Sequence, residues 1–226
     1  MQLMPLPQRV WNFGDLSLDL SKPHVMGILN VTPDSFSDGG QHHAQEAAVQ
    51  RALQMIEEGA TVIDIGGEST RPGASVVGLQ EELDRVVPVV EALAQYPVVL
   101  SIDTSQPEVM RAAVQAGAHI WNDVRALTRP HALQTAAALN IPVIIMHMRG
   151  EPTTMNQLDQ YEDVTQYVIK EINQRVEDAL QAGVKNENII IDPGFGFAKN
   201  VEQNLKLLKE FHLLNQLGYP ILSALA

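Results

Sequence analysis

The chain has 226 residues, of which 45% are hydrophobic and 19% charged, with 15 glycines and 13 prolines. This composition is typical of a soluble globular protein and excludes a disordered or fibrous chain. The formal charge of −12, from 15 Lys and Arg against 27 Asp and Glu, opposes nonspecific binding to nucleic acid or to an anionic membrane.

The first residues show no basic region followed by an apolar one, so we expect no secretory signal. No apolar run reaches the ~18 residues that span a bilayer, and the lack of cysteine excludes disulfides and thiolate chemistry. We therefore expect a cytoplasmic, enzyme-sized domain with no membrane partner. Residues 9–20 alternate apolar and polar side chains around a Gly-Asp pair, which predicts a small hairpin.

Short β-branched apolar runs alternate with segments of helical periodicity along the rest of the chain. The predicted strands are 25–30, 61–66, 98–103, 118–123, 142–147, 189–192 and 220–225. The predicted helices are 45–58, 79–94, 107–116, 132–139, 161–182 and 201–215. This alternation is typical of parallel strands covered by helices, either a (β/α)8 barrel or an open doubly wound sheet.

Polar side chains stand at the carboxyl ends of almost all these strands. They are Asn30, Asp64 with Glu68, Asp103, Asn122 with Asp123, His147 and Asp192. Ligands of parallel α/β proteins gather at these ends, and polar residues at so many successive ends favour one shared mouth. We predict a single α/β domain over residues 1–226, with a hairpin (1–24) and a (β/α)8 TIM barrel (25–226) in which about seven of the eight strands are present.

The segments that leave successive strands carry motifs rich in Gly, Pro, Asp and Ser. They include LNVTPDSFSDGG (29–40), DIGGESTRPG (64–73), SIDTSQPEV (101–109), NDVRAL (122–127) and IDPGFGFAKN (191–200). Any one of them alone could be a solvated connector. Together and in this order they closely resemble the dihydropteroate synthase family, from about Val25 to Leu222.

That resemblance implies a TIM-barrel transferase of folate biosynthesis. Members condense 6-hydroxymethyl-7,8-dihydropterin pyrophosphate with para-aminobenzoate, and release pyrophosphate and 7,8-dihydropteroate with the help of Mg²⁺. Sulfonamides compete for the aminobenzoate position, and the family enzymes are homodimers.

A pterin edge presents adjacent N–H donors and a carbonyl, so its pocket needs paired acceptors and an amide. Asp103, Asn122 and Asp192 supply that set, and the resemblance implies that they bind the pterin. Met146 would line the same pocket. The alternative roles are capping for a strand-end Asp or Asn and core packing for the methionine.

The reaction breaks a bond between a methylene carbon and a pyrophosphate oxygen, and the electron-rich pterin can stabilise the resulting cation. A fixed carboxylate beside that cation helps, and Asp103 is the candidate. For pyrophosphate and Mg²⁺ we predict Asn30 as the metal ligand through its carboxamide oxygen, with Thr70 and Arg71 holding the anion. The predicted catalytic residues are thus Asp103, Asn30 and Arg71.

Para-aminobenzoate needs a flat apolar slot, for which Phe36, Pro72 and Phe197 are the candidate walls. Because the first two lie in loops, we expect the slot to form when those loops close over bound pterin pyrophosphate. The seven histidines lack the spacing of a helical zinc site, and neither a Walker A nor a GxGxxG motif is present. Mg²⁺ is the only predicted cofactor.

The C-terminus departs from the family pattern. Members continue after the seventh strand into a Ser-Arg-Lys-Ser motif, an eighth strand and helices of the dimer interface, whereas the chain as written ends at Ala226. For the chain as written we therefore expect an impaired dimer, poor stability or self-association, and no measurable activity, unless Arg71 or Lys199 replaces the absent cations. The alternative function is a non-catalytic, truncated pterin-binding fragment. A pterin methyltransferase is disfavoured because the NVTPDSFSDGG and STRPG loops are those of the synthase.

Overall fold

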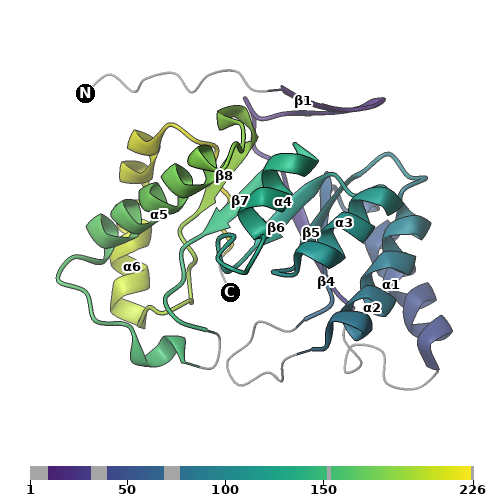
Figure 1. Cartoon of the computed structure of the whole chain (residues 1–226), viewed down its shortest axis with the longest axis horizontal. Helices are drawn as coiled ribbons and strands as arrows, with labels where there is room; N and C mark the ends of the chain where they lie inside the picture. Colours follow the sequence, from purple (N-terminus) through teal and green to yellow (C-terminus); the bar gives the residue numbers. More distant parts are fainter. Residues whose placement is uncertain (1–9, 32–39, 69–76, 152–153, 225–226) are drawn as a thin grey trace. The chain divides into compact units, whose positions relative to one another are not determined.

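The computed structural model describes residues 10–31, 40–68, 77–151 and 154–224, which form two compact units (Figure 1). The described part of the first unit comprises residues 10–31, 40–68 and 77–122, and that of the second comprises 123–151 and 154–224. Both units show the predicted alternation of strands and helices.

The predicted N-terminal hairpin is present in the first unit. Strands β1 (Val10–Phe13) and β2 (Leu16–Asp19) pair antiparallel. The turn between them starts at Gly14, whose φ of 61° suits the first position of a tight hairpin turn. The ring of Phe13 lies 4.9 Å from that of His119, which immediately precedes a strand of the same unit. This contact places the hairpin at the amino-terminal end of that strand.

The first unit also holds four parallel strands and three helices. In chain order these are β3 (Met26–Asn30), α1 (Gly40–Glu57), β4 (Val62–Gly66), α2 (Leu79–Leu93), β5 (Val99–Asp103), α3 (Pro107–Ala116) and β6 (Ile120–Asp123). The strands pair in the order β3, β4, β5, β6, and α1, α2 and α3 pack side by side (Figure 1).

The ends of α3 show why the sequence predicts these helices well. Pro107 occupies the first turn, where its missing N–H has no intrahelical partner in any case. Gly117 ends the helix with φ at 115°, a left-handed conformation that glycine adopts without a Cβ clash. Strand β4 is buried along its whole length, as its nearly continuous apolar sequence predicts.

The second unit continues the pattern with two paired strands and three α-helices. Its elements are α4 (Ala132–Leu139), β7 (Val143–Met146), α5 (Val164–Gln181), β8 (Ile189–Asp192) and α6 (Val201–Lys209), with short 3₁₀ helices η2 (Met155–Gln157), η3 (Asn186–Asn188) and η4 (Phe211–Leu217). Strands β7 and β8 are parallel, and Met146 lies opposite Asp192. No helix in the described part of the chain is long and apolar enough to cross a membrane.

Three predicted boundaries are wrong. Helix α1 begins five residues earlier than predicted, at Gly40, and α5 begins at Val164 because the Asp163 side chain caps it by accepting a 3.2 Å bond from Gln166 N. The predicted helix 201–215 ends as α-helix at Lys209 and continues as 3₁₀.

The seventh predicted strand is reduced to a single parallel bridge between Ile221 and Ile191. Ile191 N donates to Pro220 O at 3.0 Å, and Leu222 N donates to Ile191 O at 2.9 Å. Pro220 has no N–H to extend this ladder toward the amino end. The described residues after it therefore form one bridge in place of a full strand.

Candidate active site

Four residues at the carboxyl ends of β3, β4, β5 and β6 lie opposite one another in the sheet. Asn30 pairs with Gly66, Gly66 with Asp103, and Asp103 with Asn122. We call these four residues the first strand-end row. Because paired residues of adjacent strands project to the same face, the row brings Asn30, Asp103 and Asn122 to one side of the sheet, as the sequence predicts.

Gly66, which has no side chain, lies in the middle of this row. A Cβ atom at Gly66 would lie 3.5 Å from Asp103 Cβ and 3.8 Å from Asn30 Oδ1, so these two side chains flank the glycine. Asn30 is exposed, Asp103 is half-buried and Asn122 is buried. The row therefore offers oxygen acceptors that range from exposed to buried, which suits a polar ligand that approaches from solvent.

The buried carboxylate of Asp64 lies below the row. The sequence marks Asp64 as a polar strand-end residue but predicts no role for it in the site. Asp64, two residues before Gly66 on β4, accepts a 2.9 Å hydrogen bond from Asn122 Nδ2. Burial raises the pKa of Asp64, against the opposing effect of the neighbouring Ser101 hydroxyl and the Asn122 amide. An acidic residue inside the apolar run VIDIG is the sequence signal that could have identified it.

Buried side chains from elsewhere in the first unit hold the end of β5. Thr104 Oγ1 donates to Glu82 Oε1 at 2.5 Å, and Glu82 is buried on α2. Trp121 Nε1 donates to Thr104 O at 2.7 Å. These bonds fix the backbone that follows Asp103, so the carboxylate of Asp103 sits on a rigid support.

The second unit carries a shorter row, formed by Met146 at the end of β7 and Asp192 at the end of β8. These two residues are register partners, both are buried, and His147 N donates to Asp192 O at 2.9 Å. We call this pair the second strand-end row. Asp192 Oδ1 accepts a 2.7 Å bond from Gly194 N, so the carboxylate also shapes the loop that follows its strand.

A cavity of about 580 Å³ opens in the second unit beside Met146. Its other lining residues include Arg125, His147, Arg149, Glu171 and Arg175, but Asp192 is not among them. The cavity therefore does not coincide with the predicted pterin acceptor Asp192, and within each unit the candidate site residues are those of its own strand-end row.

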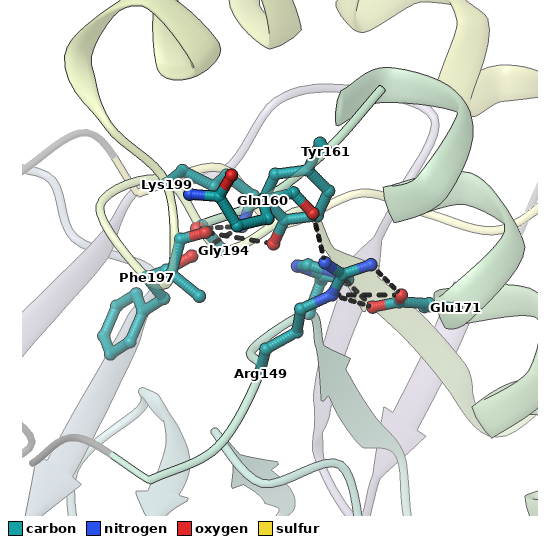
Figure 2. Close-up of polar contacts among 9 residues, drawn as sticks. Arg149, Gln160, Tyr161, Glu171, Gly194, Phe197 and Lys199 are labelled. Carbon is teal, nitrogen blue, oxygen red and sulfur yellow. Dashed lines mark hydrogen bonds and ion pairs between the residues drawn. The ribbon is translucent and has the colours of Figure 1, made fainter. Parts of the chain in front are cut away.

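A polar network joins the end of β7 to helix α5 (Figure 2). His147 Nε2 lies 2.8 Å from Glu171 Oε2, and Arg149 makes an ion pair with the same carboxylate. Burial lowers the pKa of His147 to about 4, so the neutral ring donates its Nε2–H to Glu171. Partial burial opposes ionisation of Glu171, but the bonds from His147 and Arg149 outweigh it and lower the pKa of Glu171 to about 2.

The loop after β8 follows a tight path. Gly194 has a φ of 65°, and a Cβ there would lie 2.1 Å from His147 O. Only glycine allows this close approach of backbone to backbone. Lys199, which is buried, donates from Nζ to Gly194 O at 2.7 Å and to Phe197 O at 2.8 Å (Figure 2). The loop thereby presents Phe197 half-buried.

The structure describes six of the ten predicted site residues. It brings Asn30, Asp103 and Asn122 together in the first row, and Met146 with Asp192 in the second, while Phe197 lies in the loop after β8. The other four, Phe36, Thr70, Arg71 and Pro72, lie outside the described residues. Among the described residues, no group of three His, Asp or Glu side chains could hold a metal ion by itself.

Comparison with known proteins identifies the family. Residues 26–226 match the model of the pterin binding enzymes. Dihydropteroate synthase of Escherichia coli strain K12 is 54% identical over 203 residues, which make up 88% of this chain and 72% of that protein. The chain belongs to the dihydropteroate synthase family.

Solved structures of dihydropteroate synthases support the same family assignment. The Xanthomonas albilineans enzyme with 4-aminobenzoic acid matches with a TM-score of 0.89 and 48% identity, over 96% of this chain and 77% of that chain. The Yersinia pestis enzyme in a sulfonamide drug complex has a TM-score of 0.89 and 49% identity, over 95% and 78%. Because these dihydropteroate synthases are TIM barrels, the match confirms the predicted fold class.

Proposed function

We propose that the chain condenses 6-hydroxymethyl-7,8-dihydropterin pyrophosphate with para-aminobenzoate to give 7,8-dihydropteroate and pyrophosphate in folate biosynthesis. The observation that carries the proposal is the first strand-end row, because its acceptors stand in register at the carboxyl ends of parallel strands. In a chain of this family, that row is where a polar heterocycle would bind.

The proposed pterin contacts come from Asp103, Asn122, Met146 and Asp192. The carboxylates accept the N–H donors of the pterin edge, and Met146 covers an apolar part of the ring. Because Asn122 gives one N–H to Asp64, its carboxamide oxygen turns the other way and can accept from the ligand. Asp64 is thus proposed as a positioning residue for Asn122.

Asp103 is proposed to stabilise the transition state. As the bond between the methylene carbon and the pyrophosphate oxygen breaks, the electron pair leaves with pyrophosphate and positive charge develops on the carbon and pterin. A fixed carboxylate in a water-poor site stabilises that charge without reorganising solvent. The amine nitrogen of para-aminobenzoate then forms the new bond to carbon and loses a proton.

The oxygen chemistry of the first row fits Mg²⁺. Asn30 is exposed and offers a carboxamide oxygen, a hard ligand of the kind that Mg²⁺ accepts alongside water and phosphate oxygens. We propose that Asn30 holds the ion, with Thr70 and Arg71 on the pyrophosphate. When bound, Mg²⁺ would neutralise charge on the leaving pyrophosphate, which matters in a chain of net charge −12.

The proposed aminobenzoate slot is built from Phe36, Pro72 and Phe197. Relatives that were solved with 4-aminobenzoic acid and with a sulfonamide support this class of ligand. Phe197 is half-buried, so part of its ring is available to a ligand. The homodimer and the cytoplasmic location stay predictions, of which light scattering tests the first.

The direct test is an assay of pyrophosphate release. Turnover is measured in a chain that also carries the family's C-terminal motif. There we expect release only when the pterin pyrophosphate, para-aminobenzoate and Mg²⁺ are all present, with competitive inhibition by a sulfonamide against aminobenzoate. Binding of the pterin pyrophosphate without release would contradict the transferase proposal and favour a non-catalytic pterin-binding protein. Chelation of Mg²⁺ should weaken binding of the pterin pyrophosphate more than binding of the pterin alone, and equal losses would contradict the role of Asn30.

A further inference from the structure

The loop after β8 contains a lysine whose ammonium group donates hydrogen bonds to backbone carbonyls of the same loop. Lys199 is only 8% exposed, and its Nζ donates to the carbonyls of Gly194 and Phe197 at 2.7 and 2.8 Å. Lysine is rarely this buried unless its charge is compensated by partners. The burial of a charged side chain for these two bonds indicates that the loop conformation around the two carbonyls must be fixed.

Those carbonyls define the conformation of Phe197. Its own N–H donates to Gly194 O at 3.1 Å, and its own C=O accepts from Lys199, so both polar backbone groups of Phe197 are bound. The next carbonyl, that of Ala198, accepts from the Tyr161 hydroxyl at 3.0 Å. Figure 2 shows Lys199 beside the Gly194 and Phe197 carbonyls, with the Phe197 ring directed away from the Arg149–Glu171 pair.

The two phenylalanines of this loop are held differently. Phe195 is buried and its ring stacks on that of Phe211, with a centroid distance of 6.2 Å. Phe197 is only half-buried. Packing therefore anchors Phe195, whereas the orientation of Phe197 depends more on its backbone and hence on the lysine that binds that backbone.

We propose that Lys199 is a positioning residue for the aminobenzoate substrate: by bridging the carbonyls of Gly194 and Phe197, it fixes the half-buried Phe197 ring before that substrate binds. The proposal rests on the proposed function, in which Phe197 is a wall of the slot. Because its ammonium group binds these two carbonyls, we expect Lys199 to contact neither substrate directly, and the expectation that it could replace other cations is not supported.

The charge of Lys199 is sensitive to pH near neutrality. Burial lowers the pKa of Lys199 to about 7, while the carboxylates of Asp192 on β8 and Glu171 on α5 raise it and Arg149 lowers it further. His147, at the end of β7, is neutral in this range because burial lowers its own pKa to about 4. Loss of the proton turns two charge-assisted hydrogen bonds into weaker neutral ones, so the bridge should loosen as pH rises through 7.

The first test observes Phe197 without any substrate. Fluorine NMR of protein labelled with fluorophenylalanine reports on its five phenylalanines, and the Phe197 resonance is assigned from Phe197→Leu. Lys199→Met should shift or broaden that resonance, whereas Lys209→Met, at an exposed lysine of α6, should leave it unchanged. In the unaltered protein, the same resonance should move with a midpoint near pH 7.

The second test measures the substrate dependence of turnover. Lys199→Met should raise the KM for para-aminobenzoate by about tenfold, the loss typical of a charge-assisted bond, and leave the KM for pterin pyrophosphate within about twofold. The aminobenzoate KM of the unaltered protein should rise with pH through 7, and that of Lys199→Met should not.

The outcomes separate the inference from the proposed function. An unchanged Phe197 resonance in folded Lys199→Met would overturn the inference, and equal rises in both KM values would overturn it too. A changed resonance with an unchanged aminobenzoate KM would support the bridge but contradict the assignment of Phe197 to the slot. If Lys199→Met does not fold, the pH titration of the unaltered protein decides, because a resonance that stays fixed between about pH 6 and pH 9 would overturn the inference.

Discussion

The first strand-end row and the loop after β8 place their side chains by different means. In the first row, Asn30, Asp103 and Asn122 stand on strands whose backbone pairing aligns them. In the loop, Phe197 is placed by side chains that bind backbone carbonyls, chiefly Lys199 and Tyr161. Backbone pairing between strands therefore positions the first-row side chains, whereas the position of Phe197 depends on additional side-chain contacts.

This difference predicts where mutations act. Backbone ladders tolerate a change of side chain, because they use N–H and C=O groups alone. A loop held by side chains loses its shape when one of them is removed. Substitutions around the ends of β7 and β8 should therefore cost more stability than matched substitutions at the first row.

The largest effect is expected for Gly194→Ala. Its new Cβ would lie 2.1 Å from His147 O, a backbone atom that cannot move aside without shifting the end of β7. We expect a loss of about 4 kcal/mol or more in the free energy of unfolding, measured by urea denaturation. Gly196→Ala is the matched control, because Gly196 also has a positive φ but nothing within 4 Å of the added atom. That control should lose only about 1–2 kcal/mol, and equal losses would contradict the close approach.

A smaller loss is expected for Glu171→Gln. The carboxylate binds both His147 and Arg149, and its removal weakens two charge-assisted bonds. Because about a third of the Glu171 side chain is exposed (35%), we expect only about 1 kcal/mol. The pKa of Glu171 is lowered from 4.5 to about 2, so this stability should be present above pH 4.5 and be lost as the pH falls through 2.

Unfolding curves at pH 7 and at about pH 2 check this prediction. The difference between the variant and the unaltered protein should shrink at the lower pH. A difference that is the same at both pH values would show that packing, not charge, accounts for the effect. Glu177→Gln, at an exposed position of the same helix, is the control.

The smallest effect is expected at Asp64, and its sign is opposite. Burial raises the pKa of Asp64 above the usual 3.8, so the folded state binds the proton more tightly than the unfolded state does. The folded state therefore loses stability as the pH rises from 3.8 through the raised pKa. Asp64→Asn keeps the acceptor for Asn122 but removes the charge. We therefore expect it to stabilise the protein at pH 7 by about 0.5 kcal/mol, with no gain below pH 3.8. A destabilised variant at pH 7 would show that Asn122 and Ser101 stabilise the ionised carboxylate by more than burial penalises it.

The sequence predicts most of the fold because its local patterns agree with the tertiary structure. The strand β4, a continuous apolar run, and the helix α3, with Pro107 at its start and Gly117 after its end, appear where expected. The first row could also be predicted, because register between parallel strands follows once each strand end is located. The seventh strand is the exception, since pairing at Ile221 depends on partners that no local pattern specifies.

The side-chain contacts that hold the end of β7 and the loop after β8 could not be predicted from the sequence. Glu171 lies on α5, and nothing in the helical period indicates that it meets His147 and Arg149. Lys199 follows a glycine-rich segment, where a lysine is usually solvated, yet it is buried. The role of Glu171 arises from contacts with residues far away in the chain, and that of Lys199 from the particular turn of its own loop. Only the structure reveals either contact.

The most direct test is the turnover of Asp103→Asn in a chain that also carries the family's C-terminal motif, since the central claim is that the first row stabilises a developing cation. The substitution preserves shape and removes the charge, so turnover should fall by about 100-fold while the melting temperature changes by no more than about 2 °C. Asp84→Asn, at an exposed position on α2, should alter neither quantity. Turnover of Asp103→Asn equal to that of the unaltered protein would contradict the account.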